Sequence, residues 1–445
     1  MRHAPIQSPG LVALLRLLPE ADLQQLASYL GQRTCLDLCR VSRDLHALFL
    51  PLALHTVHFN VATCPAPLAL VATCRRHGRH IRRFAGTFSR PAGWPVRPGV
   101  APTDIVPYLT RLDRLRLYWP HGVTPTLLRQ WVAPLAGRLT HIDLRQDPTH
   151  HTAGLAIQVP VDLLHGIHRL AALTLVGFGT NDPRIWTALF QAHSHLTTLR
   201  LPRRAPDAAL AAAARYLTDL AHLQIDALRT GPATLAAVAQ GCPRLRRLTV
   251  TGLTPHNIPA LIHLHPAHWV DLTHLSLAQD AWAFVEAASA DPSPGPSHYQ
   301  GLFATAWPRL RSLTLRHAPL DDPTLALLGR RCPRLRRLTL TVGDPPAVTD
   351  RGYRHLLAHA PHLTEFALEA DVDPDRPTDL LPAHKLASSA LRRLRLYLGR
   401  IYPSDLLILL PQLPHLRAVT LPRACRKADL NALRIRCPHL TITFG

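Results

Sequence analysis

The chain has 445 residues, of which 47% are apolar, and it carries a formal net charge of +21. Eight cysteines in a chain of this length do not make a disulfide framework, and without a run of 18 apolar residues we expect no transmembrane helix. Lys385 and Lys427 are the only lysines among 50 basic residues, so the charge is almost entirely arginine. A GC-rich coding sequence produces such a bias too, so the charge indicates an acidic partner only if the arginines share a face.

The first nineteen residues do not resemble an export signal. The apolar stretch from Leu11 to Leu18 contains Arg16 and meets Pro19 without a small-residue cleavage site. The same residues lack acids, which leaves a mitochondrial presequence as the alternative. We expect the protein in the cytoplasm, the nucleus or both.

The segment from Leu17 to Phe59 predicts a short helical bundle. Pro19 suits a first helical turn, and Gly31 suits a C-terminal cap. One apolar stripe with helical spacing lies between Pro19 and Gly31, and a second lies after Gly31 and ends before Pro51. They are formed by Leu23, Leu26 and Leu30, and by Leu38, Val41, Leu45 and Leu48.

This segment resembles an F-box, in particular the fungal type that precedes leucine-rich repeats. The matching residues are Leu18-Pro19-Glu20, the Tyr29-Leu30 pair and Leu36-x-Leu38-x-x-Val41-Ser42-Arg43. The resemblance implies a surface that docks on the Skp adaptor of a cullin-based ubiquitin ligase. It assigns that surface to Leu18, Pro19, Leu26, Leu30, Leu36, Leu38 and Val41. Leu45 and Leu54 replace the family's tryptophans, and the alternative is that these helices only cap a repeat array.

Residues 61–110 predict a joint between the helices and the repeats. His80 to Phe84 resembles a degenerate first repeat, and Gly86 to Asp104 is rich in proline and glycine. We expect a loop there, either a lid or a disordered insertion.

The rest of the chain repeats the frame Leu-x-x-Leu-x-Leu. CPRLRRLTV from Cys242 recurs almost unchanged as CPRLRRLTL from Cys332. Successive frames are mostly 24 to 31 residues apart, and a step of 38 contains a Pro/Ser-rich insertion near 287–300. The first frame residues are Leu112, Leu139, Leu170, Leu196, Leu220, Leu245, Leu272, Leu310, Leu335, Leu363, Leu391 and Leu416.

These repeats resemble leucine-rich repeats of the cysteine-containing subtype found in F-box proteins. The resemblance implies an α/β solenoid, a horseshoe with parallel strands on the concave side and helices on the convex side, over residues 111–445. Residues 1–60 then form the F-box-like module. The family's Asn or Cys after the strand is missing, because the ninth frame position holds residues such as Phe178, Leu253 or Asp371. We therefore expect irregular loops after the strands.

The cysteine slot of the repeat predicts apolar volume rather than a metal site. Cys242, Cys332 and Cys437 precede proline in this slot, and other repeats place Trp307, Ala360 or Leu413 there. A slot that accepts tryptophan, alanine and leucine does not require a thiolate. No metal and no cofactor are expected.

Alternation along the strands predicts which residues face the concave side. The third, fifth and seventh frame positions are mostly basic, with acids at Asp226, Glu365 and Glu369. The candidate partner-binding residues are Arg114, Arg116, Tyr118, Arg145, Arg200, Arg247, Arg316, Arg337, Arg393, Arg395 and Tyr397. Arginine pairs bidentately with carboxylate or phosphate, so an acidic or phosphorylated protein is the expected partner.

Together these features predict a non-enzymatic substrate receptor of a Skp-cullin-F-box ligase. No nucleophile and base motif stands out, and the Gly177 to Asp182 loop lacks the context of a nucleotide-binding turn. The alternatives are an interaction scaffold without a ligase link and an RNA-binding solenoid. We rank RNA lowest, because the basic residues lack interleaved aromatics.

Overall fold

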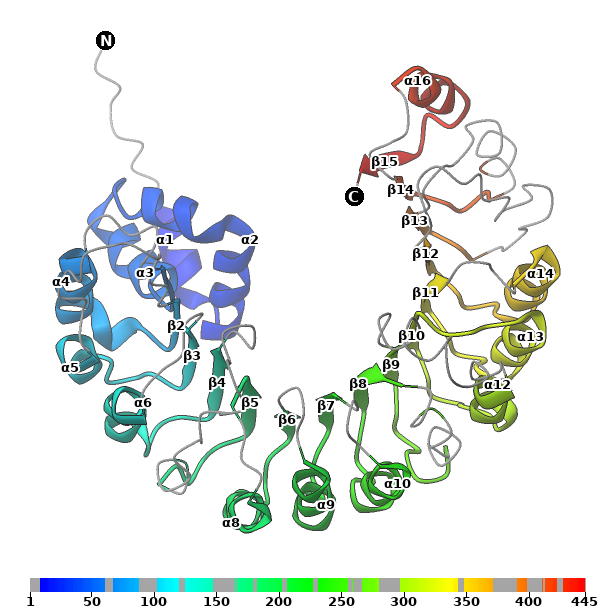
Figure 1. Ribbon diagram of the computed structural model, residues 1–445. Helices are drawn as coiled ribbons and strands as arrows, with labels where there is room; N and C mark the ends of the chain where they lie inside the picture. The colour runs from blue at the N-terminus through cyan, green and yellow to red at the C-terminus, as the bar shows by residue number, and fades with distance from the viewer. Residues whose placement is uncertain are drawn as a thin grey trace, which may run out of the picture. The chain divides into compact units, whose positions relative to one another are not determined.

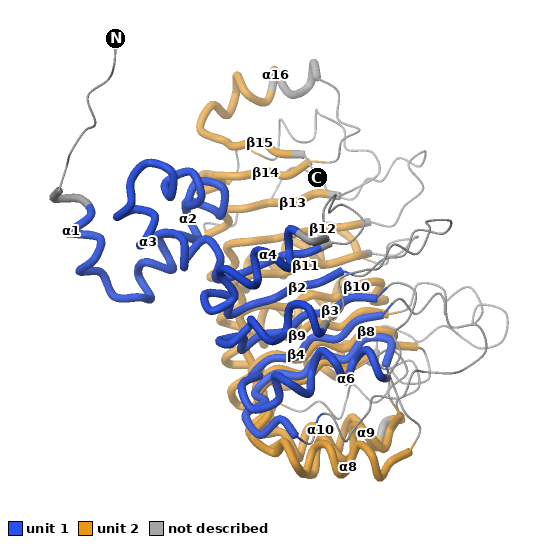
Figure 2. Tube along the Cα trace, turned by 90° about the vertical axis from the view of Figure 1, so that its left-hand side faces the viewer, with its two compact units in different colours: residues 1–180 blue, residues 181–445 orange. Residues whose placement is uncertain are grey.

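The computed structural model divides into two compact units, residues 1–180 (unit 1) and 181–445 (unit 2), coloured separately in Figure 2. The residues it describes are 9–60, 67–87, 102–119, 125–146, 164, 166–178, 182–201, 206–226, 231–254, 258, 266–279, 297–342, 348–370, 390–397, 410, 413–421 and 427–444.

Unit 1 begins with three helices and continues with strands that alternate with short helices (Figure 1). Its helices are α1 (Pro9–Leu17), α2 (Glu20–Leu38), α3 (Arg43–Ala53), α4 (Pro67–His77), α5 (Pro102–Ile105) and α6 (Pro125–Val132), with 3-10 turns η1 (Gly78–His80), η2 (Val106–Tyr108) and η3 (Ala133–Leu135). Its strands are β1 (Thr56–Asn60), β2 (Arg83–Thr87), β3 (Arg114–Trp119), β4 (His141–Gln146) and β5 (Ala172–Val176).

Unit 2 consists of the same strand and helix repeat throughout. Its helices are α8 (Pro183–Ala192), α9 (Asp207–Tyr216), α10 (Pro232–Gly241), α12 (Ser297–Ala304), α13 (Asp322–Arg331), α14 (Asp350–His359) and α16 (Lys427–Arg436). Its strands are β6 (Thr198–Arg200), β7 (His222–Asp226), β8 (Arg247–Leu253), β9 (His274–Gln279), β10 (Ser312–Arg316), β11 (Arg337–Val342), β12 (Glu365–Ala370), β13 (Arg393–Tyr397), β14 (Ala418–Leu421) and β15 (Thr441–Phe444).

Within each unit the strands are parallel, lie in sequence order and pair frame residue with frame residue. Leu115 pairs with Ile142 in unit 1, and Leu248 pairs with Leu275 in unit 2. In unit 1 the helices α4, α5 and α6 lie on one side of the strands, and in unit 2 all the described helices do (Figure 1). Each unit is therefore an α/β leucine-rich repeat array, as the period of the frame predicts.

The frame residues form the core of both units. None of the first, fourth and sixth frame residues from Leu112 to Leu421 is more than 4% exposed. The cysteine slot is apolar interior, because Cys242, Cys332, Trp307 and Ala360 are all buried there. Burial raises the pKa of the Cys242 and Cys332 thiols to about 12, so both stay protonated.

A backbone ladder precedes the strands and sets their register. The carbonyl oxygen of Arg246, the second frame residue, accepts from the N–H groups of Thr273 at 2.9 Å and His274 at 3.1 Å. Asp113, Arg336 and Thr364 accept the equivalent pairs of bonds from the next repeat. The Thr273 hydroxyl also donates to the Arg246 carbonyl at 3.0 Å, so threonine strengthens the ladder where it occurs.

The positions after the strands are filled in two ways. Phe178 and Leu253, at the ninth frame position, are buried. At the eighth position the amide of Gln146 donates to the Gly177 carbonyl, and the amide of Gln279 donates to the Tyr299 hydroxyl at 2.8 Å. Apolar packing and glutamine thus serve where the family uses asparagine. The loops beyond Arg200, Gln279, Val342 and Ala370 lie outside the described residues, so their expected irregularity stays a prediction.

Carboxylates link the starts of neighbouring helices in unit 2. Asp322, in the first turn of α13, accepts from the backbone N–H of Thr349 at 2.7 Å, and Thr349 caps α14. Asp207 of α9 accepts from the N–H of Gly231 before α10 at 3.1 Å. Each carboxylate satisfies a donor at the next helix N-terminus and holds adjacent repeats in register.

The N-terminal helices differ from the predicted pair of stripes at two points. Gly31, with φ +78°, breaks α2 as predicted. The second stripe is divided, however: Leu38 ends α2, and Leu45 and Leu48 lie on α3. The prediction that the stripe stops before Pro51 is wrong, because α3 continues to Ala53. Pro51 removes the backbone N–H that would donate to the Ala47 carbonyl, and the burial of Phe49 and Ala53 in the module core offsets this loss.

Candidate functional site

The α1–α3 module (residues 9–53) has a small core and an apolar outer surface. Cys35, Phe49 and Ala53 are buried at its centre. Of the residues assigned to adaptor docking, Leu26, Leu30 and Leu38 pack against this core. The others face solvent: Leu18 is 39% exposed, Leu36 37% and Val41 70%, and Pro19 is exposed.

Further apolar side chains of the module are exposed, although their sequence pattern does not assign them to docking. Tyr29 is 79% exposed and Leu17 80%, and Leu14 is exposed on α1. An ion pair of 2.7 Å joins Arg16 to Asp44, so the end of α1 and the start of α3 are adjacent. Exposed apolar groups gathered on one small module are typical of a protein interaction site.

The module is anchored to the first repeats of unit 1. Ala53 ends α3 only three residues before β1 begins at Thr56. The Gln32 side chain donates to the Thr56 carbonyl of β1 at 3.5 Å, and Glu20 pairs with Arg82 at 3.2 Å. In Figure 2 the module extends to one side of the unit 1 strands.

The second candidate surface is the strand face, which we define in each unit as the exposed side chains of the strands on the side away from the helices. In unit 1 it holds Arg114, Arg116 and Tyr118 on β3 and Arg145 on β4. Asp143 accepts from Arg116 at 2.7 Å and from Arg145 at 2.7 and 2.9 Å. Arg116 and Arg145 are thereby held in place and partly neutralised.

In unit 2 the predicted residues Arg200, Arg247, Arg316, Arg337, Arg393 and Arg395 all lie on the strand face, each at least partly exposed. The side chain of Tyr397 lies outside what the structure describes. The acids of the predicted acidic break are buried or bonded to neighbouring side chains. Asp226 is buried, and Glu369 accepts from the Thr341 hydroxyl at 3.1 Å. Glu365 lies between Arg337 at 3.4 Å and Arg393 at 3.1 Å.

Histidines also belong to this face, although the sequence pattern marks them only as ordinary surface residues. His222 and His274 occupy the third frame position on β7 and β9, beside Arg247 of β8. Burial lowers the pKa of both rings, and the charge of Arg247 lowers it further. The signal that could have identified His274 is the pair Thr-His before a frame leucine, which occurs at Thr140-His141 as well.

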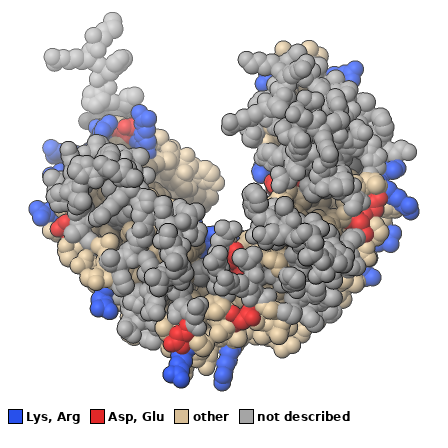
Figure 3. All heavy atoms as spheres, in the orientation of Figure 1, with Lys and Arg blue, Asp and Glu red and all other residues tan. Residues whose placement is uncertain are grey.

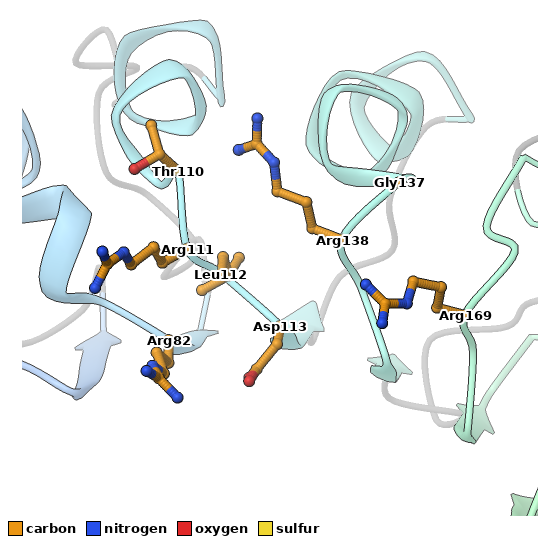
Figure 4. Close-up of a pocket in the computed structure, with 8 residues that line it drawn as sticks. All are labelled: Arg82, Thr110, Arg111, Leu112, Asp113, Gly137, Arg138 and Arg169. Carbon is orange, nitrogen blue, oxygen red and sulfur yellow. The ribbon is translucent and has the colours of Figure 1, made fainter. Parts of the chain in front are cut away.

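A pocket of about 300 Å³ lies in unit 1 where the chain enters the strands (Figure 4). Arg111, Arg138 and Arg169 each precede the first leucine of a repeat, and Arg138 extends away from the direction taken by Arg82 and Asp113. At the same frame position in unit 2, Asp219 pairs with Arg244 at 2.6 Å. Of the four arginines that line the pocket, Arg82 pairs with Glu20, and the other three make no ion pair with a described acid, so the pocket is cationic.

Arginine is not confined to the strand face. Figure 3 shows basic side chains along the outer margins of the molecule as well. Exposed arginines on the helices include Arg75, Arg129, Arg184, Arg215 and Arg330. The net charge by itself therefore does not identify a site. A site has to be identified from the local arrangement of charges.

Neither a membrane span nor a metal cluster occurs among the described residues. No helix there combines the length and hydropathy that a membrane crossing requires. No group of three or more histidine, cysteine, aspartate or glutamate side chains in that part of the chain is placed to hold a metal ion.

Comparisons with known proteins give structural likeness only. No family model and no curated protein matches the chain. It is similar to a chain in the crystal structure of the Rad7 and Elc1 complex in yeast, at 15% identity over 97% of this chain and 90% of that one, with a TM-score of 0.48. The leucine-rich repeat-containing protein LegL7 from Legionella pneumophila matches at 13% identity over 72% of this chain and 94% of its own, with a TM-score of 0.39. These scores carry no functional argument, and the repeat fold stands on its register and burial.

Proposed function

We propose that the protein is the non-catalytic substrate-recognition subunit of a Skp-cullin-F-box ubiquitin ligase. The observation that carries the proposal is the α1–α3 module, which leaves Leu18, Pro19, Leu36 and Val41 exposed at the positions that resemble the F-box docking surface. A helix pair that served only to cap the repeats would turn such side chains toward the array.

The energetics suit a docking surface. Full burial of an aliphatic side chain of this size stabilises a complex by roughly 1.5–3 kcal/mol. Val41 and Leu18 retain much of their area for a partner to cover. Leu26, Leu30 and Leu38 support that surface from beneath by packing on the Cys35 and Phe49 core.

The substrate side of the proposal uses the strand face. Its arginines suit an acidic or phosphorylated protein segment. The contacts of Glu20 with Arg82 and of Gln32 with Thr56 join the adaptor-binding module to the first strands of unit 1. The receptor acts by proximity, since the ligase's other subunits supply the chemistry. A ligase of this type would work in the cytoplasm or the nucleus.

Co-purification with a fungal Skp adaptor tests the proposal. The double variant Leu18→Asp with Val41→Asp places charge on the docking surface without opening the core, and we expect it to weaken adaptor binding at least tenfold, or about 1.4 kcal/mol. Ile435→Asp is the control, because Ile435 is an exposed apolar residue on α16, outside the module. Failure of the folded wild-type chain to bind the adaptor would reduce the protein to an interaction scaffold.

A further inference from the structure

Four adjacent strands of unit 2 present a continuous set of anion-binding side chains. The register aligns Arg247, His274, Ser312 and Arg337 at the third frame position of β8, β9, β10 and β11. Two residues further along, the same strands expose a row of hydroxyl groups. That row is Thr249, Ser276, Thr314 and Thr339. We call these eight residues the β8–β11 cradle; with strands about 4.8 Å apart, it spans roughly 15 Å across the sheet.

The cradle has an excess of positive charge. Arg247 makes no ion pair with any acid that the structure describes, and neither does Arg311, which precedes β10. Arg337 has a single acidic neighbour, Glu365 at 3.4 Å, and Glu365 also contacts Arg393. An added anion would therefore meet cationic groups from at least two strands.

The neighbouring Thr273 determines which nitrogen of the His274 ring carries the proton. The Thr273 hydroxyl donates to the Arg246 carbonyl at 3.0 Å, so its oxygen is left to accept from Nδ1 of His274, at 2.8 Å. In the neutral ring the proton is then on Nδ1, and Nε2 carries the lone pair. Nε2 makes no hydrogen bond with the described residues, and it becomes a donor only when the ring is protonated.

We propose that the β8–β11 cradle binds the phosphate monoester of a phosphoserine or phosphothreonine in the partner protein. Arginine forks and hydroxyl donors suit its three acceptor oxygens and its charge of about −1.5 to −2. A carboxylate offers fewer oxygens and half the charge. A nucleic acid fits less well, because none of the described cradle residues is a Phe, Tyr or Trp on which a base could stack. The proposal rests on the proposed function only in naming the partner a substrate.

Binding should take up a proton. A phosphate dianion only accepts hydrogen bonds, so contact with Nε2 of His274 requires the protonated ring. The groups that act on this ring from the neighbouring strands are His222, Arg247, Arg311 and Arg337, and together with burial they keep it neutral in the free protein. A bound phosphate neutralises the positive charges around the His274 ring and therefore favours its protonated form. Affinity should therefore rise as pH falls from about 8 to 7, by up to about tenfold per pH unit for each proton taken up.

The test uses the full chain without its adaptor and three fluorescent peptide pools. The pools are degenerate around a central phosphoserine, serine or glutamate, and binding is measured by fluorescence anisotropy. We expect the phosphoserine pool to bind at least about tenfold more tightly than the other two, since charge-assisted hydrogen bonds to phosphate are stronger than neutral ones. Arg247→Gln and His274→Gln should each remove most of this preference. Arg434→Gln, which removes an exposed charge on α16, should leave it unchanged.

Several results would overturn the proposal. Equal binding of the three pools would do so, as would a phosphate preference that survives Arg247→Gln. Single-stranded RNA that displaces the phosphopeptides through the same residues would assign the cradle to nucleic acid instead. Ser312→Asp guards against a folding artefact, because it adds a repelling charge on the half-buried third position without opening a cavity; it should abolish the preference while the melting temperature is retained.

The two proposals fail separately. The same preparation is assayed for adaptor binding, which depends on the module and not on β8–β11. Adaptor binding without a phosphate preference refutes the cradle alone. A phosphate preference without adaptor binding refutes the ligase role and leaves the cradle intact.

Discussion

Gly241, the last residue of α10, lies against the backbone of Ala214 in α9. A Cβ built on Gly241 would lie 2.7 Å from the backbone carbon of Ala214 and 2.9 Å from its Cα, and closer still to its carbonyl oxygen. Such contacts are shorter than carbon atoms tolerate, and backbone cannot rotate away as a side chain can. Gly241→Ala must therefore push α10 from α9, where Leu210, Ala213 and Val238 are buried.

The expected cost can be bounded. Overpacking a tight interior costs about 1–3 kcal/mol, and alanine recovers at most about 1 kcal/mol of helix propensity over glycine. We expect Gly241→Ala to lower the free energy of unfolding by about 1–2 kcal/mol, measured by urea denaturation with circular dichroism. Gly137→Ala is the control, since a Cβ added there would meet no described atom within 4 Å, and it should be neutral or slightly stabilising. A Gly241→Ala protein as stable as the control would refute the close packing of α9 and α10.

Three further outcomes follow from burial and hydrogen bonding. Stability should decrease as pH falls below about 6.5, because burial lowers the pKa of six histidines in the folded chain and the unfolded chain binds protons first. They are His55, His77, His80, His141, His222 and His274. Cys332, whose thiol pKa burial raises to about 12, should react with iodoacetamide at pH 8 only after denaturation, because its thiolate is about a thousandfold scarcer than at the ordinary pKa of 9.0. Asp322→Ala should cost about 1–2 kcal/mol through the lost bonds to Thr349, whereas Asp271→Ala, which breaks the surface pair with Arg309, should cost under about 1 kcal/mol.

A specific result would contradict each of these three predictions. Denaturation midpoints that stay level from pH 7 to 5.5, or that fall just as steeply in His274→Gln, would argue against the histidine contribution. Mass spectrometry that finds Cys332 alkylated in the native protein would show that its slot opens. Equal losses for the two aspartate variants would mean that the helix-start link stabilises no more than a surface ion pair.

The core could be predicted from the sequence because its pattern is redundant. Every repeat has apolar residues at the first, fourth and sixth frame positions, as at Leu245, Leu248 and Val250. This spacing places all three side chains on the same side of the repeat, where they can be buried together. The slot shared by Cys332 and Trp307 was predictable for the same reason. This slot requires only an apolar side chain that fills the interior, and the type of amino acid at the position shows whether it is one.

The sites were less predictable because they depend on neighbours that are distant in sequence. His274 belongs to the cradle through Arg247 and Arg337, residues that precede and follow it by more than twenty positions and meet it only through strand register. Asp226 could not be distinguished from an exposed acid, since its burial depends on the β8 bulge at Gly252, which packs against its carboxylate. The course of α3 past Pro51 likewise depended on packing against α2, which outweighed a local helix-breaking signal.

The measurement that tests the account most directly is whether one molecule of the protein holds adaptor and phosphopeptide at once. The chain is captured on an immobilised Skp adaptor, and the phosphoserine pool is then titrated over it by surface plasmon resonance. We expect binding with the affinity seen for the free chain, because the α1–α3 module and the β8–β11 cradle consist of different residues. Capture that fails with the folded wild-type chain, or capture that abolishes phosphopeptide binding, would contradict a receptor that joins a substrate to the ligase.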